Sequence, residues 1–200
     1  MESIGGKIRE KISELHDEFE KGFDERRAKF QYTVHQGRVE FEHSIAIRHR
    51  LLRMRVGHFL AQSKLSYIFT APFIYSLIIP IALTDLFVTV YQNVCFRTYR
   101  VPLVKRSEYV VRDRKYLEYL NAIQKLNCMY CEYSNGVIAY AREVASRTEQ
   151  FWCPIKHARK LKDAHDRYYD FIEYGDSEDL PTKMEDQREK CRACEVPCGK

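Results

Sequence analysis

The sequence lacks the short motifs that mark the common enzyme families. It contains no G-x-S-x-G nucleophile turn, no phosphate-binding P-loop, no G-x-G-x-x-G dinucleotide turn and no H-E-x-x-H zinc motif. Glu40 and His43 have the E-x-x-H spacing of di-iron carboxylate helices, but such a site needs a second copy of the motif, and the sequence has none. Because no catalytic motif is present, the sequence favours a protein that is not an enzyme.

Acidic residues are missing between Ser44 and Thr84, and every charged residue is missing between Ser66 and Thr84. From Leu65 to Val94, Asp85 is the single charged side chain, although the whole chain is 30% charged. A solitary apolar run of this length is usually surrounded by lipid. The sequence therefore predicts a membrane protein with polar parts on both sides of the run.

Length, proline and flanking charge indicate how this run meets the membrane. Thirty helical residues would extend about 45 Å, beyond the roughly 30 Å of a hydrocarbon core, and Pro80 divides the run into two arms. Basic residues stay on the cytoplasmic side, and they flank both ends of the run: Arg48, Arg50, Arg53, Arg55 and Lys64 before it, and Arg97, Arg100, Lys105 and Arg106 after it. We therefore predict a membrane-inserted helical hairpin, re-entrant or spanning, with its tip near Pro80, in preference to a single crossing. Both termini would then lie on the cytoplasmic side of the cytoplasmic membrane.

Asp85 has three interpretations. A carboxylate inside an apolar segment is costly and often functional, which makes Asp85 a weak catalytic candidate. It could instead cap the helical stretch that follows Thr84, by accepting hydrogen bonds from free backbone amides. It could also mark the far interface of a simple span. The two structural roles are favoured over catalysis.

The charge distribution predicts the kind of partner. The formal net charge is +5, and because residues 163–200 are acidic, residues 1–162 are more basic than this figure indicates. Basic charge beside an apolar run predicts contact with anionic membrane lipid. No nucleic-acid-binding motif accompanies it, and we do not expect nucleic acid as a partner. The first residues contain no hydrophobic signal region, so we do not expect export of the N-terminus.

Periodicity predicts a mainly α-helical chain in four parts. Residues 1–64 contain an amphipathic helix over 4–30, which could bind a protein partner or a second copy of the chain. Residues 30–41 are either a short hairpin with Gly37 in its turn or a continuing helix, and residues 43–63 are a basic helix in the headgroup zone. Residues 65–95 form the membrane-inserted hairpin.

The other two parts follow the hairpin. Residues 96–175 form a cytoplasmic helical bundle, with helices expected over 113–131, 137–150 and 154–174. Ser134-Asn135-Gly136 is a predicted break, Pro154 is expected in the first turn of the third helix, and Gly175 is expected to end it. Residues 176–200 form an acidic tail that contains cysteines.

The spacing of the cysteines predicts a metal site in this bundle. There are 7 cysteines, an odd number, which in a chain without an export signal indicates thiolate ligation and not a disulfide framework. Cys128 and Cys131 form a C-x2-C pair, and Cys153 and His157 form a C-x3-H pair. Together they are a complete four-ligand set that suits zinc or an iron–sulfur cluster, and the spacing does not choose between the two.

A second ligand set competes with this compact one. A straight helix over 137–150 would be about 20 Å long and would hold Cys153 far from Cys131. That geometry favours the alternative set, which is Cys128, Cys131, Cys191, Cys194 and Cys198. We prefer the compact set because the last residues of a chain are often mobile. Its conflict with a plain middle helix stays open, as does the simpler interpretation that the cysteines are core or regulatory thiols.

Three functions compete at this point. The first is a membrane-associated metal-binding protein with a structural or partner-binding role. The second is a membrane-bound iron–sulfur redox protein, and the third is an enzyme acting on a lipid-like substrate, with Asp85 or a cysteine taking part. The missing catalytic motifs favour the first.

Overall fold

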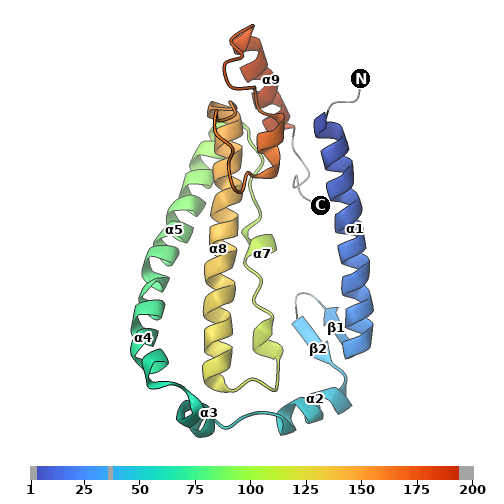
Figure 1. Ribbon diagram of the computed structural model, residues 1–200, viewed down its shortest axis with the longest axis vertical. Helices are drawn as coiled ribbons and strands as arrows, with labels where there is room; N and C mark the ends of the chain where they lie inside the picture. Colours follow the sequence, from blue (N-terminus) through green and yellow to red (C-terminus); the bar gives the residue numbers. More distant parts are fainter. Residues whose placement is uncertain (1–3, 36–37, 194–200) are drawn as a thin grey trace. The chain divides into compact units, whose positions relative to one another are not determined.

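The computed structural model describes residues 4–35 and 38–193, and this part of the chain is mainly α-helical (Figure 1). The chain forms two compact units. Unit 1 consists of Met1–Asp17, Asp85–Lys105 and Ala139–Lys200, and unit 2 consists of Glu18–Thr84 and Arg106–Ile138.

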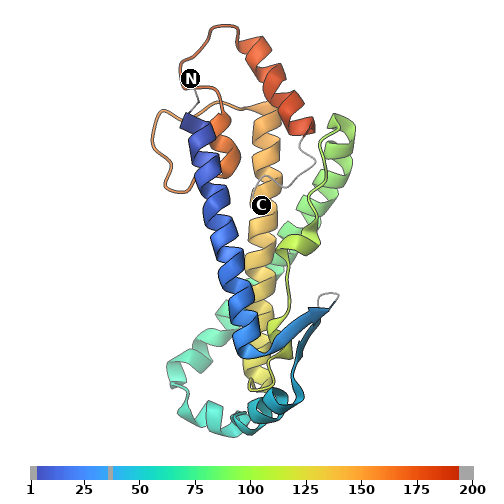
Figure 2. The same cartoon turned by 90° about the vertical axis from the view of Figure 1, so that its right-hand side faces the viewer.

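The N-terminal segment contains the predicted helix, and of the two alternatives for residues 30–41 it has the hairpin. Helix α1 (Ile4–Phe30) ends at Gln31, whose backbone is left-handed. Strands β1 (Tyr32–His35) and β2 (Arg38–Phe41) then pair antiparallel (Figure 2). Tyr32 lies opposite Phe41 in this pairing. The predicted turn residue Gly37 lies outside the described residues.

Residues 43–63 form two short helices and not one. Helix α2 (His43–Leu51) and helix α3 (Val56–Gln62) are separated by residues 52–55. Arg53 donates to a carboxylate oxygen of Glu118 at 2.6 Å and to its backbone carbonyl at 2.8 Å, and Arg50 donates to the same carboxylate at 3.3 Å. Two of the basic residues before the apolar run are therefore paired within unit 2.

The apolar run is one helix, so the predicted hairpin with its tip at Pro80 is wrong. Helices α4 (Leu65–Ser76) and α5 (Ile78–Tyr91) continue through a turn of π-helix η1 (Gln92–Phe96) into α6 (Arg97–Tyr99). Among the described residues, this 35-residue stretch, Leu65–Tyr99, is the one helix that is long enough and apolar enough to cross a membrane. Figure 1 shows α4 following directly into α5.

Pro80 does not reverse the chain because of its position in the helix. It is the third residue of α5, where the backbone lacks an intrahelical acceptor, so the missing proline N–H costs little. The interruption falls at Leu77, whose amide donates to the Ile74 carbonyl three residues back. The helix resumes when Ile81 donates to Leu77 at 3.2 Å.

The second half of the chain contains one long helix where two were predicted. After the short helix α7 (Arg106–Tyr109) and the 3-10 turn η2 (Arg114–Tyr116), α8 runs from Ala122 to Trp152. Both views show α8 without a break (Figures 1 and 2). The helix predicted over 113–131 therefore starts later than expected, and the break predicted at Ser134-Asn135-Gly136 is absent.

Gly136 has a packing role inside α8. A Cβ atom at this position would lie 2.7 Å from the Tyr109 carbonyl oxygen and 2.8 Å from the Val110 Cα atom. Only a residue without a side chain lets residues 109–110 approach α8 this closely. The glycine that signalled a break in the sequence instead marks a close contact within unit 2.

Residues 153–175 are largely irregular, and the third helix predicted from Pro154 to Tyr174 is wrong. Pro154 ends α8, because the residue before a proline is disfavoured in helical conformation. Ile155 instead pairs in parallel with Ile172, through hydrogen bonds of 2.7 and 2.8 Å. A 3-10 turn, η3 (Asp166–Asp170), precedes a turn at Gly175, and α9 spans Leu180–Arg192.

The apolar core of unit 1 forms around the second half of α8. Tyr140, Val144 and Phe151 are buried on α8, and Phe151 stacks on Tyr99 with ring centroids 5.0 Å apart. The other elements of the unit contribute further buried residues, which are Phe96, Val101, Val104, Phe171, Ile172 and Cys191.

Candidate functional site

In unit 1, the polar side chains of residues 85–93 of the helix Leu65–Tyr99 lie on its packed side. Gln92 is 4% exposed. Its amide nitrogen donates to the Tyr140 hydroxyl at 2.6 Å and to the Val104 carbonyl at 3.2 Å, and its amide oxygen accepts from the Val104 N–H at 2.9 Å. Each polar atom of this buried amide is therefore matched within unit 1.

Neighbouring turns continue this polar side. The Tyr91 hydroxyl lies 3.0 Å from the Thr148 hydroxyl, and the Thr89 hydroxyl lies 3.4 Å from that of Tyr140. Asp85 is half-buried one turn before Thr89. It is inside α5 and not at a helix start, so its predicted role as an N-cap is wrong. No group of three or more His, Cys, Asp and Glu side chains that could hold a metal ion occurs at Asp85 or elsewhere in residues 4–35 and 38–193.

The outward side of the same helix is apolar and exposed. Of its most hydrophobic 18-residue window, only 6% is buried. The exposed large side chains on α5 and just beyond it are Ile79, Leu83, Leu86, Phe87, Val90 and Val94. Helices of water-soluble proteins place apolar residues inside and polar residues outside. From Asp85 to Val94 this helix has the opposite arrangement.

In unit 2 the apolar helix has the same kind of packed side. The Tyr75 and Tyr130 rings meet edge to face with centroids 5.6 Å apart, and the Tyr75 hydroxyl donates to the Asn127 amide oxygen. The Tyr130 hydroxyl donates to the Ile74 carbonyl at 2.7 Å. Outward from this contact, Phe69, Phe73 and Leu77 are exposed.

Exposed basic side chains stand at both ends of the helix. Lys64 precedes it, with its ammonium 5.9 Å from the centroid of the exposed Tyr67 ring. Arg97 and Arg100 are exposed at the other end, where Arg100 has a left-handed backbone and ends the helix. The helix is therefore an apolar surface with positive charge at each end.

The structure does not bring the compact set of predicted metal ligands together. Cys128 and Cys131 lie inside α8, and Cys153 follows its last residue, Trp152. The 22 residues from Cys131 to Cys153 extend about 33 Å along the helix, so these two thiols do not share an ion. His157 instead has its ring 5.8 Å from that of Tyr168.

The alternative set also lacks support among the described residues. Cys191 is fully buried on α9, and its thiol points to the Arg147 carbonyl at 3.6 Å. Cys194 and Cys198 lie outside the described part of the chain. The remaining free cysteine, Cys95, is half-buried on η1.

Unit 1 contains a buried polar network around Glu143 that the sequence did not predict. In the sequence, Glu143 lies in the predicted helix over 137–150 and has the pattern of a surface charge. The Glu143 carboxylate accepts from Arg147 at 2.8 Å and from Arg167 at 2.6 Å. The side chains of the two arginines are 5% and 4% exposed. Arg147 also donates to the Pro102 carbonyl at 2.7 Å, and Arg167 donates to Gln150 at 3.2 Å. The i, i+4 spacing of Glu143 and Arg147 was the only signal in the sequence.

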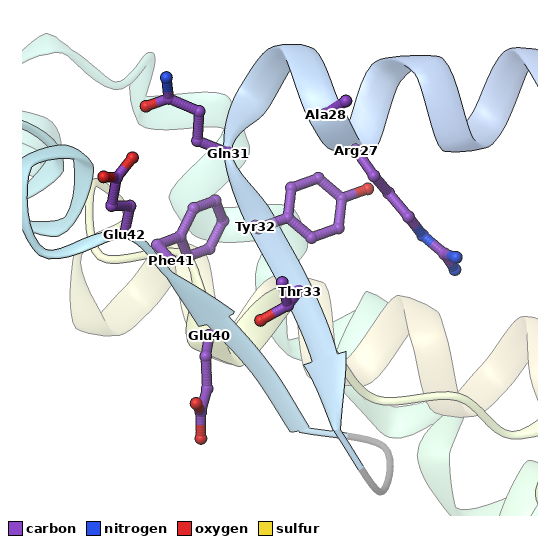
Figure 3. Close-up of a pocket in the computed structure, with 8 residues that line it drawn as sticks. All are labelled: Arg27, Ala28, Gln31, Tyr32, Thr33, Glu40, Phe41 and Glu42. Atoms are coloured by element: carbon purple, nitrogen blue, oxygen red, sulfur yellow. The ribbon is translucent and has the colours of Figure 1, made fainter.

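A shallow pocket in unit 2 lies between the end of α1 and the hairpin. Tyr32 and Phe41 stand side by side on the two strands, with ring centroids 5.5 Å apart (Figure 3). Arg27 and Glu40 also line it. Its lining contains one basic residue, Arg27, and two acidic residues, Glu40 and Glu42, but no cysteine or histidine, so it supports no chemical assignment.

No protein-family model, curated protein or solved structure was found to match this chain.

Proposed function

We propose that this chain is a membrane-associated protein without catalytic activity, in which the helix Leu65–Tyr99 is the membrane element. The observation that carries the proposal is the inverted polarity of this helix: Gln92 and Thr89 face the protein, whereas Phe87 and Val94 face outward. In water such a surface would be costly, because each large apolar side chain gains about 1.5–3 kcal/mol from leaving it. Hydrocarbon removes that cost and leaves the polar side satisfied by the protein.

The polar network around Glu143 supports a structural role for the rest of unit 1. The sequence-based hypothesis assigns the crosslinking of this bundle to a zinc ion or an iron–sulfur cluster. In the structure, Arg147 on α8 donates to the Pro102 carbonyl, and Arg167 on η3 donates to Glu143 on α8. Gln187 on α9 donates to the Asp170 carbonyl of η3. No group of three or more His, Cys, Asp and Glu side chains that could hold a metal ion occurs in the described part of the chain, and the proposed function does not depend on one.

Exposed apolar residues on α1 support a role in partner binding. Leu15, Phe19, Phe23 and Phe30 recur along α1 and are all exposed. A stripe at this spacing on a charged helix usually packs against another helix. We propose it as the contact for a second copy of the chain, and the oligomeric state of the purified protein in detergent tests it.

The membrane assignment predicts how the protein partitions. The full-length chain should co-float with vesicles of equal parts phosphatidylcholine and phosphatidylglycerol, and it should need detergent to leave cell membranes. Phe87→Gln should lower the partition into vesicles about tenfold, because a side chain that is 67% exposed in the protein would no longer enter hydrocarbon.

Tyr174→Gln is the matched control. Tyr174 is 69% exposed but lies far along the chain from the apolar helix, so this variant should float like the unmodified protein. A chain that stays dissolved after cell breakage without detergent, and does not float, would contradict the proposed function.

A further inference from the structure

We infer that the helix Leu65–Tyr99 lies in the plane of one anionic leaflet and does not cross the bilayer. The inference rests on the proposed function and specifies its surface and partner. The surface is the outward side of the helix, defined by Phe69, Phe73, Phe87 and Val94. The partner is the acyl and headgroup region of a single leaflet.

A crossing helix would draw charged neighbours into the hydrocarbon. Ala82 is the midpoint of Leu65–Tyr99, and Thr89 is about 10 Å farther along the axis, still inside a hydrocarbon core of roughly 30 Å. Thr89 contacts Tyr140 of α8, and Arg142 follows Tyr140 within the same turn. The Arg142 side chain is 48% exposed and pairs at 3.3 Å with Asp163, which is 81% exposed. A crossing would place this exposed ion pair at hydrocarbon depth, where it is strongly disfavoured.

The backbone beside this ion pair gives a second argument. Arg142 also donates to the Asp163 carbonyl at 3.2 Å, which fixes this part of residues 153–165 at the same level. These residues form no helix, and Ile155 alone makes a sheet contact. Irregular backbone that faces lipid does not occur within the hydrocarbon, because its N–H and C=O groups have no partners there. In unit 1, the outward side of α5 therefore contacts the membrane, and the side that carries Asp163 contacts water.

Within unit 2, the apolar helix and the charged residues also lie on different sides of α8. On α8, Asn127 and Tyr130 face α4, whereas Glu132 and Gly136 lie about half a turn away. Glu132 accepts from the Arg114 backbone at 2.8 Å, and its carboxylate is 3.6 Å from the Arg114 guanidinium. The segment that packs on this second side is charged, since it carries Arg106, Arg112, Arg114 and Lys115.

Charge at the ends of the helix identifies the leaflet as anionic. Lys64, Arg97 and Arg100 are exposed at the two ends, and a crossing would send one end to the side that basic residues avoid. A helix in the plane keeps both ends at the same headgroups, where each cation is attracted to anionic lipid. The exposed Tyr67 beside Lys64 is the amphipathic ring expected at this depth. The helix of 35 residues is longer than a crossing of the hydrocarbon core requires, whereas the length of a helix in the plane does not have to match the bilayer thickness.

Depth along the helix tests the inference. The chain has 1 tryptophan, so Trp152→Phe provides a background into which Phe73→Trp, Phe87→Trp or Val94→Trp is introduced one at a time. The full-length variants are bound to vesicles of equal parts phosphatidylcholine and phosphatidylglycerol that contain lipids brominated at defined depths. In the plane, all three tryptophans are quenched most by the same shallow bromines. Tyr174→Trp, in the same background, should stay unquenched.

The opposite result has a clear signature. If the helix crosses, the tryptophan at 87 lies deep in the hydrocarbon, and the one at 94, about 18 Å from the midpoint, lies among the headgroups. Vesicle binding with this difference in depth overturns the in-plane orientation and leaves the proposed function intact. If no variant binds vesicles, the proposed function itself fails. The chain could also bind the vesicles as a stable dimer in which the brominated lipids do not quench the outward tryptophans. A second copy of the chain then covers this surface, and the inference is overturned.

A labelling experiment covers the case in which a tryptophan variant does not fold. Ser44→Cys and the native Cys153 are exposed and lie before and after the helix. On preformed vesicles, both should react with a membrane-impermeant maleimide added outside, as read by mass spectrometry. Protection of one of the two until the vesicles are lysed would overturn the in-plane arrangement.

Discussion

Gln92 is a buried amide in a helix whose composition is otherwise that of a membrane segment. Its three hydrogen bonds go to Val104 and Tyr140, residues that lie 12 and 48 positions away. In the sequence, Asp85 stands out as the single charge in the apolar run, whereas Gln92 near the end of the run has no such signal. The cost of burying an unpaired amide explains why this one is fully matched.

Asp176 provides a prediction for a single residue. Hydrogen bonds at 2.7 Å from the Lys183 ammonium, together with its positive charge, hold the pKa of the Asp176 carboxyl below its ordinary value of 3.8. Because this pKa is lower in the folded chain than in the unfolded one, the contact stabilises the fold above the ordinary value. This stabilisation is lost as the pH falls through the folded pKa.

We expect Asp176→Asn to unfold at a lower urea concentration than the unmodified chain at neutral pH, and at the same concentration in strong acid. Lys183→Met removes the other partner and should give the same pH profile. A variant that is destabilised equally at every pH would show that the pair does not act through this titration.

At the scale of elements, glycine and proline were the least reliable signals in the sequence. Gly136 predicted a break and lies inside α8, whereas Pro154 predicted a helix start and ends one. Both residues are compatible with two local structures, and contacts from residues distant in the sequence decided between them. The periodic helix over 4–30 needed no such contacts and was predicted correctly. For residues 30–41 the sequence left a hairpin and a continuing helix open, and the structure has the hairpin.

Gly136→Ala should destabilise the chain by about 1–3 kcal/mol, measured by urea unfolding in detergent. Alanine favours a helix over glycine by about 1 kcal/mol, but its Cβ would lie 2.7 Å from the Tyr109 carbonyl oxygen, and overpacking of this kind costs more. Gly22→Ala is the matched control, because nothing lies within 4 Å of its Cβ position. It should stabilise the chain by about 0.5–1 kcal/mol, and the same sign for both variants would contradict the packing role of Gly136.

At the scale of the whole molecule, the polar network of unit 1 joins segments that are far apart in the sequence. Glu143 meets Arg167, Arg188 donates to the Phe151 carbonyl, and Gln187 donates to the Asp170 carbonyl. These contacts connect residues 153–175 and α9 to α8. The same residues define the charged side of unit 1, on which the in-plane orientation depends.

Glu143→Ala should therefore cost about 3–5 kcal/mol, because it leaves two buried arginine side chains without their shared carboxylate. Residues 153–175 should then become sensitive to limited proteolysis. Glu149→Ala is the control: this carboxylate is 33% exposed and contacts only the half-buried His165 among its ion pairs, so the expected loss is below about 1 kcal/mol. Equal losses in the two variants would show that the network does not hold the unit together.

The sequence alone determined that the chain is mainly helical, that residues 65–94 form its apolar element and that basic residues flank both ends, because composition and periodicity are local properties. Tertiary structure decided that the apolar element is one helix, that the second part of α8 separates Cys131 from Cys153, and that Thr89 and Gln92 of the apolar helix face inward. Each of these depends on which residues distant in the sequence come into contact. Spacing along the chain determines the direction in which a side chain points from its own helix, but not which distant residues it contacts.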